Sequence, residues 1–334
     1  MTDSVYFGDM MRTLHEIRDE LKSINKKLDS LCSNKKALDN SLNHKNNFTH
    51  HVDKNNVKIW SATRLPFEPK GWLVDMREQI RQDLRLLNLE IDHTFCAYYV
   101  SSDNSFCDVE NILFYNVGVS NFNNLTKNGL IFERVFKQPP EFQKFGFPHF
   151  QHYSVGKNFF SYWKLEKELA KFSSAPIRHF SSDTKVDHIW YALKKGNIQS
   201  LDSLKTSQNF GLELKLNLNR ETRLSSILKV LLDGIISAFQ SHLNDNNQFL
   251  FDKISERLEI NPEQVRELLL NEDNAVLGKN KLIHKRADSI QWNPKDDGLV
   301  KVQVFPKYSD SEYTTFSGKI FSVKTYESED NTQI

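Results

Sequence analysis

The stretch from Met10 to Leu42 contains neither glycine nor proline, and its apolar residues recur at intervals of three and four. This 3.5-residue repeat keeps one seam of a helix facing a partner, which is typical of a coiled coil. The seam residues are Leu14, Ile17, Leu21, Ile24, Leu28 and Leu31. We therefore predict a coiled-coil helix over residues 1–43 through which copies of the chain associate. A long amphipathic helix folded back on the body of the same chain is the alternative.

The rest of the chain predicts an α+β fold with a mixed sheet backed by long helices. Residues 44–56 are polar, rich in asparagine and without periodicity, so we expect a flexible linker there. The body follows over residues 57–334. It is either one domain or two halves, 57–140 and 200–326, with an aromatic-rich insert between them.

Apolar periodicity gives the expected elements of the body. The expected helices cover residues 71–88, 161–172, 220–243 and 261–272. The expected strands cover residues 57–66, 93–102, 130–140, 211–219, 299–306 and 318–326, and the last two are expected to be neighbours in the sheet.

Composition favours a soluble, cytoplasmic protein. With 44 basic and 43 acidic side chains, the formal charge of +1 gives no overall field that attracts nucleic acid or an anionic membrane. No run of about 18 apolar residues predicts a membrane span, and the first residues lack the pattern of a cleaved signal. The three cysteines form no CxxC pair, so we expect a reducing compartment.

The chain lacks the GxxxxGK[ST], GxGxxG, HExxH and GxSxG motifs and has no zinc-spaced cysteines. Its first candidate catalytic residues are Asp108 and Glu110, in CDVENILF after a predicted strand. Carboxylates at a strand end can bind Mg²⁺ or Mn²⁺, which activates water and neutralises a phosphodiester transition state. Alternatively, both residues begin a helix, where carboxylates favour the positive end of the dipole.

The segment CDVENILF resembles part of the pattern of the RusA-type Holliday junction resolvases, an Asp-x-Asp-Asn step that leads into an apolar helix with a lysine. Here Glu110 replaces the second aspartate and Phe114 stands at the lysine position. The resemblance implies a metal-dependent enzyme that cleaves nucleic acid, with Asp108 and Glu110 among its catalytic residues.

A second segment, RLSSILKVLLDGI, resembles the same pattern at its other end. Lys229 and Asp233 have the spacing of the family's lysine and later aspartate, whereas Arg223 and Ser225 occupy the positions of its paired acids. Asp233 is therefore the third candidate catalytic residue.

Asp296 and Asp297 lie in QWNPKDDGLV, where Asn-Pro followed by Asp-Asp-Gly is typical of a turn between strands. A second hypothesis brings both residues together with Asp233 around a metal ion, with His284 as a further ligand.

Other segments offer binding candidates. Lys279, Lys281, Lys285 and Arg286 form a basic run that either contacts phosphates or is a solvated loop. The aromatic residues between Phe142 and Trp163 either stack on nucleic-acid bases or pack in the core.

The histidine pairs point to no metal site. His50–His51 and His149 with His152 lack further ligands at a fixed spacing. The first pair is expected to be solvated and the second packed or hydrogen-bonded.

Two functions follow from these patterns. The first is a homo-oligomeric binding or adaptor protein with an unknown protein or nucleic-acid partner and no membrane partner. The alternative is a metal-dependent enzyme that cleaves nucleic acid, which requires Mg²⁺ or Mn²⁺; otherwise no cofactor is indicated. Three or more carboxylates converging in one cleft would favour the enzyme, and an exposed aromatic patch would favour the adaptor.

Removal of residues 1–45 is expected to lower the oligomeric state, because the seam is lost, and to leave a folded body. Light scattering gives the mass in solution, and circular dichroism checks the fold. An unchanged number of chains per particle would remove the coiled-coil hypothesis.

Overall fold

The structure is a computed structural model that describes residues 47–102, 108–136, 138–205, 208–243 and 247–325. By its internal contacts the chain divides into two compact units, residues 1–49 and 50–334. The predicted coiled-coil helix lies outside the described residues, so it stays a prediction. Strand β1 (Phe48–Val52) lies within the segment that the sequence predicts to be a linker.

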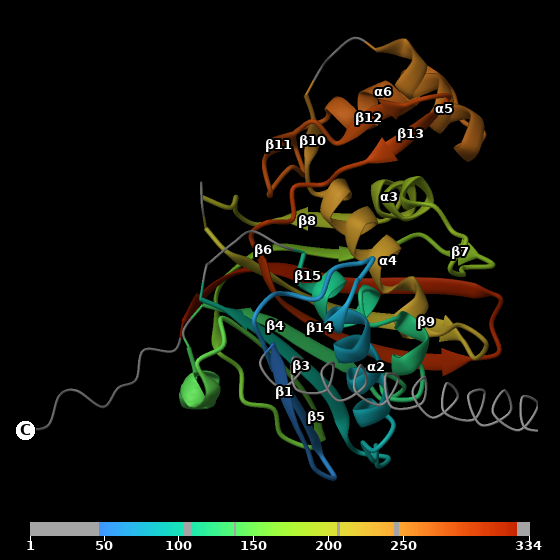
Figure 1. Cartoon of the computed structure of the whole chain (residues 1–334). Coiled ribbons are helices and arrows are strands. Elements are labelled where there is room, and N and C mark those ends of the chain that lie inside the picture. The colour runs from blue at the N-terminus through green and yellow to red at the C-terminus, as the bar shows by residue number, and fades with distance from the viewer. Residues whose placement is uncertain (1–46, 103–107, 137, 206–207, 244–246, 326–334) are drawn as a thin grey trace, which may run out of the picture. The chain divides into compact units, whose positions relative to one another are not determined.

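The described residues confirm a mixed α+β fold, built on an 11-stranded sheet (Figure 1). Ten strands run across it in the order β1, β2 (Asn56–Ser61), β5 (His149–Gly156), β3 (Thr94–Ser101), β4 (Leu130–Val135), β14 (Leu299–Ser309), β9 (Phe210–Asn219), β15 (Tyr313–Thr325), β6 (Trp163–Ser173) and β8 (Asn197–Ser200). The short strand β7 (Ile177–Arg178) pairs with β15.

The other elements are helices and two small sheets. The helices are α2 (Trp72–Leu84), α3 (Val186–Lys194), α4 (Leu224–Ala238), α5 (Gln248–Leu258) and α6 (Pro262–Leu270), with the short turns η1 (Asn111–Tyr115), η2 (Val119–Phe122) and η3 (Pro140–Phe145). The small sheets pair β10 (Ser241–His242) with β11 (Lys279–Asn280), and β12 (Ile283–Arg286) with β13 (Ser289–Trp292).

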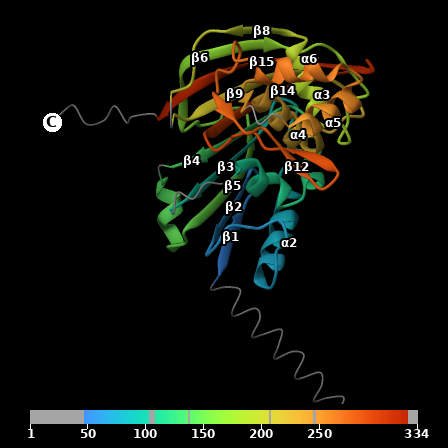
Figure 2. The same ribbon diagram turned by 90° about the horizontal axis from the view of Figure 1, so that it is seen from above.

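Two parallel strand pairs meet at the centre of the large sheet. Strand β3 is parallel to β4, and the connection between them contains η1 and η2. Strand β9 is parallel to β14, and their connection contains α4. Strands β4 and β14 are antiparallel neighbours. Both connections lie on one face of the sheet, because the Ser225 hydroxyl of α4 donates a hydrogen bond to the Asn123 side chain (2.7 Å). Figure 2 shows α2 and α4 on that side.

Helix α4 forms where the sequence predicts the most apolar helix. Its leucine and isoleucine residues recur every three or four positions, and those facing inward are buried, including Leu228, Leu231 and Ile235. Gly234 permits close packing against α3, because an added Cβ would lie 2.6 Å from Ile189. No helix among the described residues is both long and apolar enough to cross a bilayer.

Two sequence predictions are wrong. Residues 161–172 were expected to be helical, but β6 covers most of this segment, although its lysine, glutamate and leucine residues favour helices. Backbone pairing with β15 along this segment outweighs the helix preference of these residues. The strands at 299–306 and 318–326 are not neighbours, because β9 lies between β14 and β15.

A buried ion pair joins the two halves of the sheet. Glu133 of β4 is fully buried, and its carboxylate lies 3.3 Å from the Lys301 ammonium of β14. The backbone N–H of Tyr162 donates to Glu133 (2.8 Å), and Lys301 donates to the carbonyl of Trp163 (2.9 Å). Burial raises the pKa of Glu133, and the Lys301 ammonium opposes that rise.

Replacement of Lys301 by methionine is expected to lower the free energy of unfolding by about 3 kcal/mol, because Glu133 then stays buried without its counter-charge. The double variant Glu133→Gln/Lys301→Met should recover part of this loss, because neither charge is left. Urea unfolding measures both. A single variant as stable as the wild type would contradict this account of the pair.

Candidate functional site: an acidic cluster around Lys229

Asp108 and Glu110 lie at the start of a helical segment, residues 109–115, that follows β3. The carbonyl of Asp108 accepts hydrogen bonds from the backbone N–H groups of Asn111 (3.1 Å) and Ile112 (3.3 Å). The Asn111 side-chain amide donates to the Asp108 carboxylate (2.6 Å) and so fixes its orientation. The helix start and the catalytic hypothesis are therefore compatible. A hydrogen bond from Asn116 N–H to the Asn111 carbonyl (2.8 Å) gives the segment a π-helical turn, a feature frequent at functional sites.

Lys229 brings three of the candidate carboxylates together. Its Nζ lies 2.9 Å from Glu110 Oε1, 3.3 Å from Asp233 Oδ1 and 3.7 Å from Asp108 Oδ2. Asp233 is one helical turn after Lys229 on α4, so both side chains point to the same side. Asp296 completes the group, since one carboxylate oxygen each from Asp108, Glu110 and Asp296 lie within 4.8 Å of one another. We call these four acids and Lys229 the acidic cluster.

Burial dominates the electrostatics of the acidic cluster. Burial raises the pKa values of Glu110 and Asp233, while Lys229 opposes both shifts. Burial and the nearby Asp108 and Glu110 raise the pKa of Asp296 to about 8. Although burial opposes it, the carboxylates of Glu110 and Asp233 raise the pKa of Lys229, which therefore keeps its proton.

The acidic cluster has more negative than positive groups, and its donor set fits a hard divalent cation. Four carboxylates surround one ammonium, and Asp296 holds a proton at neutral pH. Oxygen ligands on opposite sides of Mg²⁺ lie about 4.2 Å apart. One carboxylate oxygen each of Asp108, Glu110 and Asp296 lie within 4.8 Å of one another, which is close to that separation. Small side-chain movements would therefore place all three on one Mg²⁺ or Mn²⁺ ion.

Two cavities meet at the acidic cluster and share Asp108 and Lys229. One, of about 600 Å³, is also lined by Asp233, Asn280, Gln291, Trp292, Asn293, Pro294, Lys295, Asp296 and Asp297. The other, of about 660 Å³, is also lined by Arg64, Leu65, Pro66, Phe67, Asn111, Ile112, Tyr115 and Asn116. Asp108 and Lys229 therefore face both cavities, Asp233 and Asp296 face one of them, and Glu110 is buried behind them.

The structure thus brings together the three candidate catalytic residues Asp108, Glu110 and Asp233. It also brings in Asp296, which the sequence placed either in a turn or with Asp233 around a metal ion: the Asp296 carbonyl accepts from Leu299 N–H (2.8 Å), and its side chain joins the acidic cluster. Asp297 lines the cavity of about 600 Å³ near Lys295, whereas His284 is not among the lining residues of that cavity.

Lys229 was not among the candidate site residues predicted from the sequence, although its spacing to Asp233 in ILKVLLD was noted. The signal was present, because a lysine and an aspartate four residues apart lie on one face of a helix. The sequence does not show that Lys229 also contacts Glu110, because the two residues are 119 positions apart in the chain.

The basic run borders one of these cavities through Asn280, but its charged side chains do not line it. Lys279 pairs with Glu272 (2.5 Å), and the Lys285 ammonium lies 4.6 Å from the centre of the Phe249 ring. Neither these two residues nor Lys281 and Arg286 are among the described residues that line either cavity at the acidic cluster.

The histidines at 149 and 152 are packed and hydrogen-bonded, as expected. His149 is buried, and its Nδ1 lies 2.7 Å from the Tyr99 hydroxyl. His152 Nε2 lies 3.0 Å from the Asn56 side-chain oxygen, and burial lowers its pKa to about 4. In the predicted linker, His50 instead contacts the buried Asp83 (2.7 Å).

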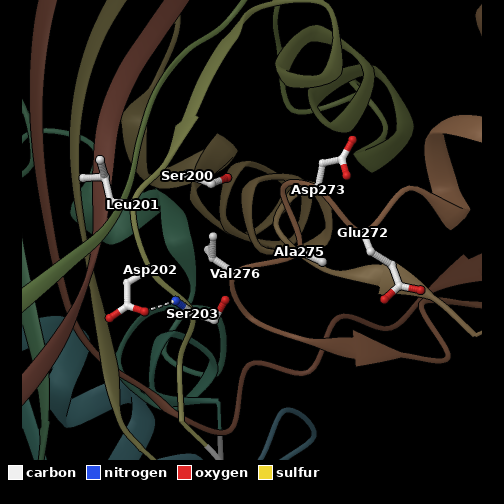
Figure 3. Close-up of a pocket in the computed structure, with 8 residues that line it drawn as sticks. All are labelled: Ser200, Leu201, Asp202, Ser203, Glu272, Asp273, Ala275 and Val276. Atoms are coloured by element: carbon white, nitrogen blue, oxygen red, sulfur yellow. Dashed lines mark hydrogen bonds between the residues drawn. The ribbon is translucent and has the colours of Figure 1, made fainter.

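A separate cavity of about 250 Å³ also has acidic residues at its rim (Figure 3). Asp202, Glu272 and Asp273 point in different directions there. Lys167 pairs with Asp202, and Lys279 pairs with Glu272, so surface lysines already balance two of the charges. This cavity therefore lacks the shared ligand centre of the acidic cluster.

Comparison with known proteins gives no family for this chain. No protein-family model matches it, and no curated protein does. The solved structure of a cyanuric acid hydrolase is similar at 10% identity over 82% of this chain and 68% of that chain, with a TM-score of 0.18. A likeness at this level carries no argument.

Replacement of Asp296 by asparagine is expected to stabilise the metal-free protein most at alkaline pH. The folded state keeps the Asp296 proton up to about pH 8, whereas the unfolded state loses it near 3.8, so wild-type stability falls as pH rises through that window. The variant lacks this loss, and its advantage should grow by about 4 kcal/mol between pH 5 and 8.5, because each pH unit inside the window changes the stability by about 1.4 kcal/mol.

Urea unfolding in a chelator at the two pH values measures this difference. Asp297→Asn, at the exposed neighbouring carboxylate, is the matched control and should show no such growth. A constant gap between Asp296→Asn and wild type would refute the pKa assignment.

Proposed function

We propose that the protein is a metal-dependent enzyme that cleaves phosphodiester bonds in nucleic acid. The observation that carries the proposal is the convergence of Asp108, Glu110 and Asp296 around one point beside Lys229. An excess of carboxylates in an accessible cleft is the donor set that Mg²⁺ and Mn²⁺ prefer. When bound, such an ion supplies an activated water and neutralises charge on a phosphoryl oxygen.

Each residue of the acidic cluster has a role that follows from its surroundings. Asp108, Glu110 and Asp296 would hold the ion. Asn111 keeps the Asp108 carboxylate in place through its hydrogen bond. Asp233 contacts Lys229 from the next turn of α4 and so holds the ammonium in the site (3.3 Å).

Lys229 supplies a fixed positive charge. Its raised pKa excludes the role of a general base at neutral pH, because the ammonium does not release its proton. A protonated lysine at the junction of the two cavities instead stabilises the negative charge that develops on a phosphate during cleavage. Replacement by methionine would remove that charge while keeping most of the side-chain volume.

The two cavities favour a polymeric substrate. A chain that crosses Asp108 and Lys229 would extend into a cavity on each side. One side offers Arg64 and Phe67, whose ring is 67% exposed, and the other offers Trp292 and Lys295. Aromatic rings stack on unpaired bases, and basic side chains contact phosphates.

The adaptor hypothesis has less support from the described residues. Most of the aromatic residues between Phe142 and Trp163 pack inward, including Phe150 and Tyr153, which are fully buried. Self-association through the predicted coiled coil is compatible with the enzyme, because it would place two or more reaction centres in one assembly.

The test is a cleavage screen of the full chain on single-stranded, duplex and branched DNA and RNA with Mg²⁺ or Mn²⁺. The wild type should cleave at least one substrate, and Lys229→Met should reduce the rate about 100-fold, by loss of the charge that stabilises the transition state. Asp108→Asn/Glu110→Gln should bring cleavage to background, because the ion loses two ligands.

Asp202→Asn, in the cavity of Figure 3, is the matched control and should keep the wild-type rate. Cleavage that persists unchanged in Asp108→Asn/Glu110→Gln, or a wild type that cleaves nothing, would refute the proposal.

A further inference from the structure

The large sheet has the same order of elements on both sides of its centre. Outward from β4 come β3, β5 and β2, and outward from β14 come β9, β15 and β6. The pairings also correspond: the first step on each side is parallel, and the next two are antiparallel. Along the chain, β2, α2, β3, η1–η2, β4, β5 correspond to β6, α3, β9, α4, β14, β15.

We propose that the body is an internal duplication about a pseudo-twofold axis between β4 and β14, and that it carries one complete reaction centre and one that has been lost. This inference rests on the proposed function. The antiparallel pairing of Leu130–Glu133 with Val304–Lys301 is the pairing that a twofold axis requires. The equivalent connections lie on one face, as the contact of Lys229 with Glu110 requires.

The two connections correspond residue by residue at their starts. Asp108 and Arg223 each directly precede the first helical residue. Three and four residues into each helix, an isoleucine and a leucine are buried: Ile112 and Leu113 in one, Ile227 and Leu228 in the other. Each connection returns to the sheet through a Gly-Leu pair, Gly129–Leu130 at β4 and Gly298–Leu299 at β14. Counting forward from the two helix starts pairs Asp108 with Arg223, Glu110 with Ser225, Phe114 with Lys229 and Gly118 with Asp233. Counting back from the two Gly-Leu pairs matches Lys127 with Asp296.

The twofold axis explains why the acidic cluster has members from both halves. The acidic cluster lies at one end of the sheet. Asp108 and Glu110 come from the start of the first connection, and Lys229, Asp233 and Asp296 come from the second half. The other end receives the equivalent residues, which are Arg223, Ser225, Phe114, Gly118 and Lys127. None of these five is a carboxylate, so this end has no equivalent ligand set.

At the second end of the sheet, aromatic packing and an arginine stand at the positions equivalent to Lys229 and Asp233. Phe114 packs against Phe122 and Phe132, with ring centres 5.0 and 5.3 Å apart, where its equivalent Lys229 meets carboxylates. The Arg81 guanidinium occupies the position of a side chain at Gly118, with Nη2 2.8 Å from an ideal Cβ. Arg81 is fixed by its own hydrogen bond to the carbonyl of Val117 (2.6 Å).

One reaction centre per chain means one strand cut per chain in each encounter with a duplex. The experiment uses linear duplex DNA and a four-way DNA junction, each assembled from strands with different labels and present in excess. Wild-type chain is mixed before refolding with a tenfold excess of Asp108→Asn/Glu110→Gln chain, so that an assembly contains at most one active chain. We expect each cut DNA molecule to carry a single break.

Arg223→Ala provides a second readout at the lost centre. Its side chain is exposed and outside the acidic cluster, so the rate of the first cut should stay within twofold of wild type. Two breaks per molecule in the mixed sample, or a rate reduced more than tenfold by Arg223→Ala, would overturn the inference and leave the proposed function intact. A wild type that makes no cut on any substrate would refute the proposed function, and the inference with it.

Discussion

The contacts of Lys229 with its carboxylates are the constraint on which the candidate site depends. They tie the start of the first connection to the middle of α4, with Asp296 from the turn before β14 close by. Buried carboxylates repel one another, and a single ammonium offsets only part of that repulsion. Such a group is costly for a structural role, whereas a divalent cation would balance it. The acidic cluster therefore has the charge and the donor atoms that fit a positively charged ligand.

The sheet explains how such a site forms from distant residues. Two parallel strand pairs meet antiparallel at β4 and β14, so the start of one connection lies beside the later part of the other. In the proposed duplication, the first half has lost its lysine to Phe114, and the second half has lost its acids to Arg223 and Ser225. These losses are compatible with one working centre because they fall at the same end of the sheet. The buried pair Glu133–Lys301 lies close to the proposed axis and holds the two halves in register.

Local patterns predicted much of the fold and part of the site. Strand β9 follows its leucine alternation, α4 follows its apolar face, and α6 begins where the helix over residues 261–272 was expected. A segment whose residues favour a helix but which pairs as a strand was predicted wrongly. The lysines and glutamates of β6 favour a helix, and only the pairing with β15, which is distant in the sequence, makes it a strand.

The site shows the same division between local and long-range information. Asp108 and Glu110 were candidates from their place after a predicted strand, and the resemblance to the resolvase pattern added Asp233, but the meeting of the three is a property of the sheet topology. The sequence left Asp296 between a turn and a metal ligand. Its backbone makes the turn, and long-range contacts also bring its side chain to the acidic cluster.

Diffraction from crystals of the full chain grown with Mn²⁺ tests the central claim most directly, because anomalous scattering locates the ion without reference to activity. The account predicts an anomalous peak bound by carboxylate oxygens of Asp108, Glu110 and Asp296, with the Lys229 ammonium still beside Asp233. Well-ordered crystals with no peak at the acidic cluster, and with Lys229 still bound to Glu110 at saturating Mn²⁺, would contradict it.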